Sequence, residues 1–274
     1  MGRDSSRTLL VAGAGDTGSR LAALAAAHGW DAVALRRRDV PTAAGVRGLR
    51  ADLASGEGFA RLPKRPEALV FCAAPDERTE AAYRVLYRDG LRRLLDATEP
   101  ARVLFVSSTA VYAEDSGAAV DESTPADAPA FNGRVLLEAE AELSAHRDAS
   151  AVRASGIYGP GRQRLWNRAQ SGPAGERRFT NRIHVDDVAG ALMHLLELPR
   201  IDALYCASDS APSLEHEVID GLRATLGLPA LGAADGPLSG KQVLNTRLRA
   251  TGWAPHYPDW RSGYASPPNQ RNPE

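Results

Sequence analysis

The sequence lacks the features that define several large classes of protein. It contains only two cysteines, Cys72 and Cys206, and each stands within an apolar run, so we expect buried free thiols rather than a disulfide. No Cys/His spacing is typical of a metal site. The formal net charge of -1 provides no global field for nucleic acid or for an anionic membrane surface.

Long hydrophobic runs are also absent. No apolar stretch reaches the ~20 residues that a membrane-spanning helix needs. Residues 1–7 (MGRDSSR) lead directly into an apolar segment without the hydrophobic region of a signal peptide. We therefore expect a soluble, cytoplasmic protein whose partners include neither a membrane nor a nucleic acid.

Short apolar runs alternate with segments of helical periodicity, which is typical of a parallel sheet with crossover helices. Strands are predicted at residues 8–12, 30–35, 46–51, 68–73, 102–106, 151–157 and 203–206, and helices at 17–28, 78–98, 134–145 and 186–198. Residues 114–130 are predicted to form a loop. The pattern indicates an α/β fold, a Rossmann-type doubly wound parallel sheet with a smaller C-terminal substrate lobe.

The predicted domain boundaries follow a change of texture after Tyr158, where glycine and proline become frequent and periodicity is weak. A dinucleotide-binding domain is predicted over residues 1–157, joined by 182–208. The substrate lobe is predicted over 158–181 and 209–265. The tail 266–274 is rich in proline, asparagine and charge, and it is predicted to be disordered.

A glycine motif follows the first predicted strand. It reads Gly13-x-Gly15-x-x-Gly18, with Asp16 and Thr17 opening the next helix. Gly13 permits the tight turn, Gly15 lets the backbone approach a pyrophosphate, and Gly18 lets the helix pack closely on the sheet. The helix N-terminus then offers unpaired N–H groups to the phosphates. These residues predict a dinucleotide site.

The end of the second predicted strand distinguishes between the two nicotinamide cofactors. An NAD site usually places a carboxylate there for the ribose 2′-hydroxyl. This chain has Arg36 and Arg37 instead, and Asp39 lies beyond that position. A guanidinium group suits a 2′-phosphate. We therefore predict NADP(H) as the cofactor, with NAD(H) as the alternative and a solvated basic turn as the structural alternative.

Further motifs lie along nearly the whole chain. They are 51–53 (ADL), 71–74 (FCAA), 105–112 (FVSSTAVY), 121–125 (DESTP), 153–162 (RASGIYGPGR) and 182–187 (RIHVDD). With the glycine motif, they make the chain resemble an extended short-chain dehydrogenase/reductase. That group includes the NAD-dependent sugar-nucleotide epimerases and dehydratases.

The resemblance implies a role for several residues. Asp52 and Leu53 would lie beside the adenine, and Ala73, Ala74 and Ser107 would line the rest of the cofactor site. Ser108, four residues before Tyr112, matches the active-site hydroxyl of the family, although a strand-end serine can simply cap a turn. The helices at 78–98 and 134–145 would pair with their copies in a homodimer, with a monomer as the alternative.

The family's catalytic pair departs from its usual pattern. The family uses a tyrosine and a lysine four residues apart, so that the ammonium group lowers the pKa of the phenol. Counting back from Glu138, Arg134 occupies the lysine position, Ala130 occupies the tyrosine position, and the neighbouring Phe131 has no hydroxyl. The family's proton donor is therefore missing.

Two functions remain open. In the first, the protein is an NADP(H)-dependent oxidoreductase or epimerase/dehydratase-like enzyme acting on a small molecule, for example a sugar nucleotide. Ser108 would then polarise the carbonyl, and Tyr112 or Tyr158 would supply the proton. In the second, the protein is a catalytically silent NADP(H) sensor.

Tyr158, Arg162 and His184 are candidate substrate residues. For Tyr158 and His184 a structural role is the alternative, Tyr158 at a turn and His184 before a helix. Tyr112 is equally well interpreted as a packing residue.

Overall fold

The computed structural model describes residues 7–38 and 43–265, and its contacts divide the chain into two compact units. Unit 1 comprises Met1–Tyr112, Ala126–Arg153 and Val188–Tyr205, and unit 2 comprises Ala113–Pro125, Ala154–Asp187 and Cys206–Glu274. Residues 113–125 and 182–187 thus group with unit 2, whereas the sequence assigned them to the dinucleotide-binding domain. Which unit holds cofactor and which holds substrate stays a prediction, and the tail 266–274 lies outside the described residues.

A seven-stranded sheet forms the centre of unit 1, in the order β11-β7-β5-β4-β1-β2-β3. The strands are β1 (Thr8–Ala12), β2 (Asp31–Arg36), β3 (Val46–Arg50), β4 (Ala68–Phe71), β5 (Arg102–Ser108), β7 (Ala149–Ala154) and β11 (Leu204–Ala207). β1 pairs in parallel with both β2 and β4. The strand order therefore reverses at β1, which confirms the Rossmann-type doubly wound sheet.

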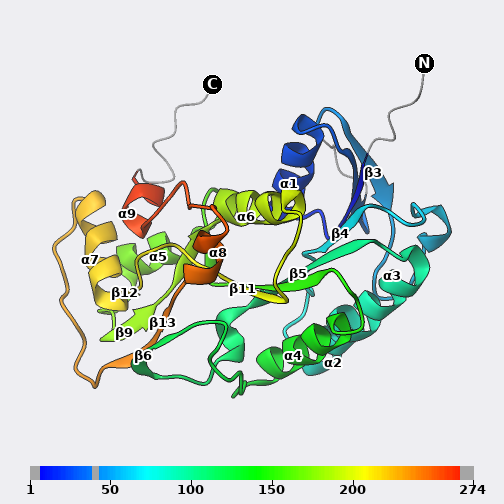
Figure 1. Ribbon diagram of the computed structural model, residues 1–274. Coiled ribbons are helices and arrows are strands. Elements are labelled where there is room, and N and C mark those ends of the chain that lie inside the picture. Colours follow the sequence, from blue (N-terminus) through cyan, green and yellow to red (C-terminus); the bar gives the residue numbers. More distant parts are fainter. Residues whose placement is uncertain (1–6, 39–42, 266–274) are drawn as a thin grey trace. The chain divides into compact units, whose positions relative to one another are not determined.

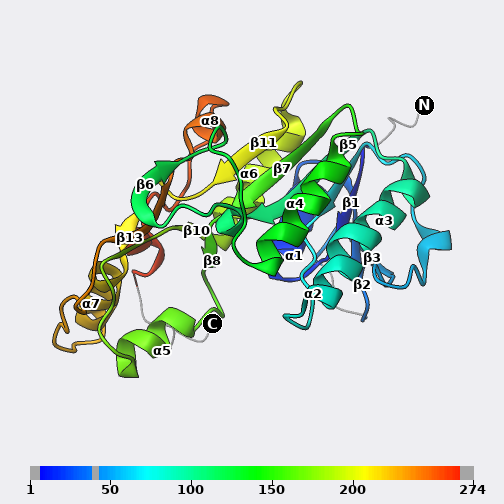
Figure 2. The ribbon, with the colours of Figure 1, turned by 90° about the horizontal axis from the view of Figure 1, so that it is seen from below.

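Helices cover both faces of this sheet. α1 (Asp16–Ala27) and most of α6 (Val185–Glu197) lie on one face, and α4 (Phe131–Leu143) lies on the other beside a long helical segment (Figures 1 and 2). That segment consists of α2 (Glu80–Tyr83), the π-helical η2 (Arg84–Gly90) and α3 (Leu91–Thr98). The predicted helix at 78–98 is thus confirmed, but its middle is wider than an α-helix. Two 3₁₀ turns, η1 (Phe59–Arg61) and η3 (Thr109–Val111), complete the unit.

The first helix ends as its sequence predicts. His28 is its C-cap, and Gly29 follows with a φ of +82°, a left-handed conformation that glycine adopts without a side-chain clash. The fourth helix begins at Phe131, three residues before its predicted start. Pro129 stands directly before the N-cap, but the N-cap itself is Ala130, which has no side chain that can cap the helix.

Unit 2 is a smaller mixed structure. Its strands are β6 (Ser116–Val120), β8 (Gly156–Tyr158), β9 (Arg178–Thr180), β10 (Arg182–His184), β12 (Ser213–Leu214) and β13 (Ser239–Val243), and its helices are α5 (Arg164–Ser171), α7 (Glu215–Thr225), α8 (Thr246–Ala250) and α9 (Trp260–Gly263). β6 lies within the segment predicted to be a loop, so that prediction was wrong there. The residues SGAAV carry no strong strand pattern, and β6 is held by pairing with the distant β13.

Aromatic and aliphatic side chains of unit 2 form a core of their own. It includes Tyr158, Trp166, Leu222, Trp260 and Tyr264. Within this core the ring of Tyr158 stacks on that of Tyr264, with ring centroids 4.5 Å apart. Among the described residues, no helix combines the length and the apolar character that crossing a bilayer requires.

Candidate functional site

The glycine motif forms a tight turn between β1 and α1. Gly13 has a φ of +95°, and a Cβ added there would lie 2.3 Å from the backbone of Ala73. A Cβ on Gly18 would lie 2.4 Å from the carbonyl oxygen of Gly13, whereas a Cβ on Gly15 would meet nothing within 4 Å. Gly13 and Gly18 therefore serve close packing, and Gly15 faces open space.

The N-terminus of α1 faces that same open space. Gly15 is the N-cap and supplies no side chain to bond the first-turn N–H groups. Asp16 in the first turn is paired with Arg20 at 2.9 Å, and Thr17 is buried. The first turn thus has no side-chain cap from Gly15, and the positive end of the helix dipole favours a phosphate group there.

A basic pocket of about 260 Å³ lies at the ends of β2 and β3. Its lining residues are Arg37, Arg38, Arg50, Ala51, Asp52 and Glu57. β2 is the neighbour of β1, so the pocket is one strand away from the glycine turn. Its lining thus has three guanidinium groups against two carboxylates, an excess of positive formal charge that favours an anion.

Arg50 is a residue that the sequence analysis missed. It ends β3, opposite Arg36 at the end of β2 in the strand register. Only the pairing of the two strands brings it next to the Arg37 loop. Arg36, which was predicted to contact the cofactor, does not line the pocket.

Asp52 and Leu53 lie in the turn after β3. Asp52 Oδ1 accepts a hydrogen bond from the Ala54 N–H at 2.8 Å, which stabilises the turn beside the pocket. Leu53 is buried, and its carbonyl oxygen accepts a hydrogen bond from Arg93 at 2.9 Å. Their predicted contact with an adenine ring stays a prediction.

The loop after β4 lies against the glycine turn. Ala73 packs on Gly13, and Ala74 follows it. The Cys72 thiol donates to the carbonyl oxygen of Gly13 at 3.3 Å, and burial raises its pKa to about 12. The thiol is therefore protonated near neutral pH and acts as a packing group. Both cysteines are free, as predicted.

Arg37 pairs with the carboxylate of Asp76, which lies in the loop after β4. Its Nη2 donates to Asp76 Oδ1 at 2.6 Å, and its Nη1 lies 2.6 Å from Asp76 Oδ2. Both side chains are mainly exposed. The guanidinium group of Arg37 holds the pKa of Asp76 below its ordinary value. Asp76 is distant from Arg37 in sequence, so no local pattern indicated this pair.

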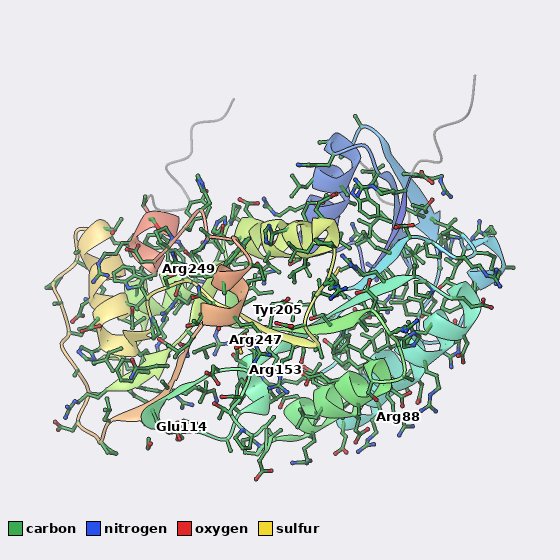
Figure 3. All side chains as sticks on the ribbon, in the orientation of Figure 1. Arg88, Glu114, Arg153, Tyr205, Arg247 and Arg249 are labelled. Carbon is green, nitrogen blue, oxygen red and sulfur yellow. The ribbon has the colours of Figure 1, made fainter. Side chains whose placement is uncertain are left out.

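The two serines at the end of β5 have different partners. The Ser107 hydroxyl donates to Glu140 Oε1 at 2.6 Å. Glu140 also forms a two-point ion pair with Arg153, the residue labelled in Figure 3. Ser108 Oγ accepts a hydrogen bond from the Ala110 N–H at 3.2 Å and caps η3. The Ser107 hydroxyl proton is therefore used within the protein, whereas Ser108 takes part in its capping bond as an acceptor.

The two tyrosines predicted as proton donors are both buried. Tyr112 is 1% exposed, with the Arg153 guanidinium group 4.9 Å above its ring. Tyr158, in unit 2, donates to the Asp259 carbonyl oxygen at 3.3 Å, and burial raises the pKa of its hydroxyl. These positions favour the packing interpretation of both residues, and a catalytic role for either stays a prediction.

Tyr83 has a different environment. The other tyrosines of unit 1, Tyr87, Tyr112 and Tyr205, are buried, whereas Tyr83 is partly exposed. It lies in α2, directly before the π-helical turn, a distortion that often marks functional sites. Its ring makes an edge contact with Phe131, with centroids 5.4 Å apart. The Tyr83 ring thus lies beside Phe131, the neighbour of the position that the sequence predicts for the family tyrosine.

Arg134 points toward the surface. It is exposed, and its Nη1 donates to the Pro129 carbonyl oxygen at 3.1 Å. The residues of α4 buried against the unit include Gly133, Val135 and Leu136. The sequence alone assigned Arg134 to the lysine position of the family. Its place on the exposed face of α4 adds no support to that assignment.

The three candidate substrate residues lie in unit 2. Tyr158 and His184 come together, with ring centroids 5.2 Å apart. His184 is 2% exposed and accepts a hydrogen bond from the Asp186 N–H at 3.2 Å, which suits its structural interpretation. Arg162 is exposed and is not buried with the other two.

Comparison with known sequences places these features among related proteins. The profile of the NAD dependent epimerase/dehydratase family matches residues 9–170. Protein YeeZ of Escherichia coli K12 is 34% identical over 125 residues, which are 43% of this chain and 45% of YeeZ. The match thus spans less than half the length of this curated relative.

Two solved structures cover almost the whole chain. A provisionally named NAD-dependent epimerase/dehydratase from Methylobacillus flagellatus is 38% identical, with a TM-score of 0.84 over 95% of this chain and 97% of that one. MoeE5, solved in complex with UDP-glucose and NAD, is 24% identical, with a TM-score of 0.79 over 95% of this chain and 97% of that one. The second likeness is one of fold.

Proposed function

Because the chain belongs to the NAD dependent epimerase/dehydratase family, we propose that it is a cytoplasmic NADP(H)-dependent oxidoreductase or epimerase/dehydratase-like enzyme acting on a carbonyl or hydroxyl group of a small molecule. The observation that carries the choice of cofactor is the basic pocket, where Arg37, Arg38 and Arg50 meet at the ends of β2 and β3. A nicotinamide dinucleotide as such is supported by the family and by the NAD in the MoeE5 structure.

The residues present fit such a dinucleotide. The open space at Gly15 and the uncapped first turn of α1 suit a diphosphate, and the arginines of the pocket suit a phosphate on the adenosine ribose. When bound, the nicotinamide ring supplies the hydride donor or acceptor. The tasks left to the chain are to orient the ring and to move a proton at the substrate oxygen.

NADPH is expected to bind about ten- to hundredfold more tightly than NADH, because a charge-assisted guanidinium–phosphate contact contributes roughly 1.5–3 kcal/mol. Fluorescence titration of both dinucleotides measures the difference. Arg50→Gln should remove most of it by weakening NADPH binding alone. Arg47→Gln is the matched control, since Arg47 lies on the same strand but pairs with Asp31. Equal affinities in the unmodified protein, or tighter binding of NADH, would contradict the proposal.

For proton transfer we assign the Ser108 hydroxyl to the substrate oxygen and Tyr83 to the acid or base role. Ser108 ends β5 and Tyr83 lies in the first turns after β4, so both are at the carboxyl ends of neighbouring strands, where ligands bind in doubly wound sheets. This assignment is supported by the burial of Tyr87 and Tyr112.

Ser108→Ala and Tyr83→Phe are expected to lower turnover by about 10²-fold or more, in line with the loss of a general acid or base. The dissociation constant of NADPH should stay within twofold of the unmodified value, because neither side chain belongs to the phosphate or ribose contacts (~0.4 kcal/mol). The assay follows NADPH oxidation with carbonyl compounds and NADP⁺ reduction with UDP-sugars, and it analyses the sugar products, because an epimerase returns the hydride and leaves no net change in the cofactor. Unaltered turnover in either variant removes that residue from the mechanism.

A sugar nucleotide is the proposed substrate class, since MoeE5 was solved with UDP-glucose. Tyr158, Arg162 and His184 of unit 2 are its proposed contacts. A homodimer through the helical segment 80–98 and α4 is proposed as the assembly.

The second candidate function is a catalytically silent NADP(H) sensor. The observation in its favour is the sequence around the start of α4, where Ala130 and Phe131 stand in place of the family tyrosine and Arg134 is exposed. The screen described above distinguishes the two functions. Tight NADPH binding with neither a change in the cofactor nor a product from any compound would favour the sensor.

A further inference from the structure

The ion pair between Arg37 and Asp76 lies at an unusual place in unit 1. Arg37 follows β2, and Asp76 lies in the loop between β4 and α2. β1 separates these two strands in the sheet. The pair therefore joins the two loops that flank the end of β1, where the glycine turn begins.

The ion pair also engages the guanidinium group of Arg37, which lines the basic pocket. Arg37 lines the pocket, yet both of its terminal nitrogens are engaged by the Asp76 carboxylate. Asp76 raises the pKa of the guanidinium group mainly through the hydrogen bond, and Asp52 adds a weaker effect through its charge. Asp76 is thus the principal acidic partner of Arg37.

Resting on the proposed function, we propose that Asp76 sets the cofactor preference of the site by competing with the 2′-phosphate of NADP(H) for Arg37. The two anions are mutually exclusive partners of the same planar fork, because a two-point contact uses both nitrogens. Binding of the phosphate displaces the carboxylate and frees the loop 72–79 from the Arg37 side. NADH carries no 2′-phosphate and leaves the pair in place.

The proposal predicts the effect of Asp76→Asn. The neutral amide keeps the shape of the side chain but removes its charge, so NADPH binding should tighten about three- to tenfold, the scale of an exposed ion pair together with anion repulsion. NADH binding should change less than twofold. The fragments 2′,5′-ADP and ADP, which differ in the 2′-phosphate, should show the same contrast.

The control is Glu99→Gln. Glu99 pairs with Arg65, and its side chain is as exposed as that of Asp76, 66% in both cases. The substitution makes the same change of charge away from the pocket, so both dissociation constants should stay at their unmodified values. A double-mutant cycle with Arg37→Gln completes the design, and the gain from Asp76→Asn should vanish in that background.

Each outcome has a defined meaning. Unchanged NADPH binding in Asp76→Asn overturns the competition even if the unmodified protein prefers NADPH. Weaker NADH binding in that variant also overturns it and assigns the carboxylate to the ribose hydroxyls. A preference for NADH in the unmodified protein contradicts the proposed cofactor, but a gain in 2′,5′-ADP binding by Asp76→Asn still supports the competition. Absence of binding by every dinucleotide and fragment overturns both.

Discussion

Replacing Arg153 by methionine should lower the free energy of unfolding by about 3–5 kcal/mol. The Arg153 and Glu140 side chains are only 6% and 11% exposed, and they meet through two hydrogen bonds. Without the guanidinium group, the Glu140 carboxylate stays buried with the Ser107 hydroxyl as its remaining partner. An uncompensated buried charge is far more costly than the loss of one surface contact. Chemical denaturation with a two-state analysis measures the change.

Arg92→Met serves as the matched control. Arg92 also pairs with a glutamate of α4, Glu142, but its side chain is 60% exposed. Its loss should cost no more than about 1 kcal/mol. If both arginine variants lose the same small amount, the Arg153 pair is not a buried charge pair in solution. Adding Glu140→Leu to the Arg153 variant should recover part of the loss, since no buried charge then remains unpaired.

Gly13→Ala and Gly15→Ala should both weaken dinucleotide binding, but only Gly13→Ala should greatly lower the stability. At Gly13 the added methyl meets the Ala73 backbone at 2.3 Å and the φ of +95° is strained for alanine. We expect a loss of about 2–5 kcal/mol in unfolding free energy, and of dinucleotide binding with it. At Gly15 the methyl meets nothing and the φ is −74°, so the loss should stay near 1 kcal/mol.

The Gly15 variant should nevertheless bind NADPH about tenfold more weakly, because the methyl group holds the diphosphate away from the first-turn amides. Denaturation and fluorescence titration on the same two proteins separate the effects. A Gly15→Ala protein that binds NADPH normally would show that the phosphates lie elsewhere. A stable Gly13→Ala protein would show that the loop after β4 can move at little cost to accommodate the added methyl group.

The elements with dense apolar patterns were predictable from the sequence. β4 is buried throughout, β1 is buried from Leu9 to Ala12, and β5 contains a buried run from Val103 to Phe105. The glycine that follows α1 has the positive φ that the sequence anticipates. These signals are local, so a single segment is enough to read them. β6 was missed because its small residues gain order only by pairing with β13, more than a hundred residues later.

The candidate site was likewise predictable only where its signal is local in the sequence. The glycine turn follows from a motif of consecutive residues, whereas the partners of its arginines do not. Arg50 reaches the pocket through the register of β3 on β2, and Asp76 reaches Arg37 across β1. Likewise, nothing local shows that the Ser107 hydroxyl is bound by Glu140 or that Tyr112 is covered by Arg153. These contacts exist only once distant segments are folded together.

The way the chain is divided between its two units limits how the protein can be dissected or can evolve. Each unit is assembled from three separated stretches of sequence, and the polypeptide passes repeatedly from one to the other. Cleaving or truncating the chain at a single position therefore yields neither unit intact. For the same reason, neither unit can be transferred to another protein as one continuous segment. A recombination that swapped the C-terminal third for that of a relative would replace only part of unit 2 and would also remove the last strand of the unit 1 sheet.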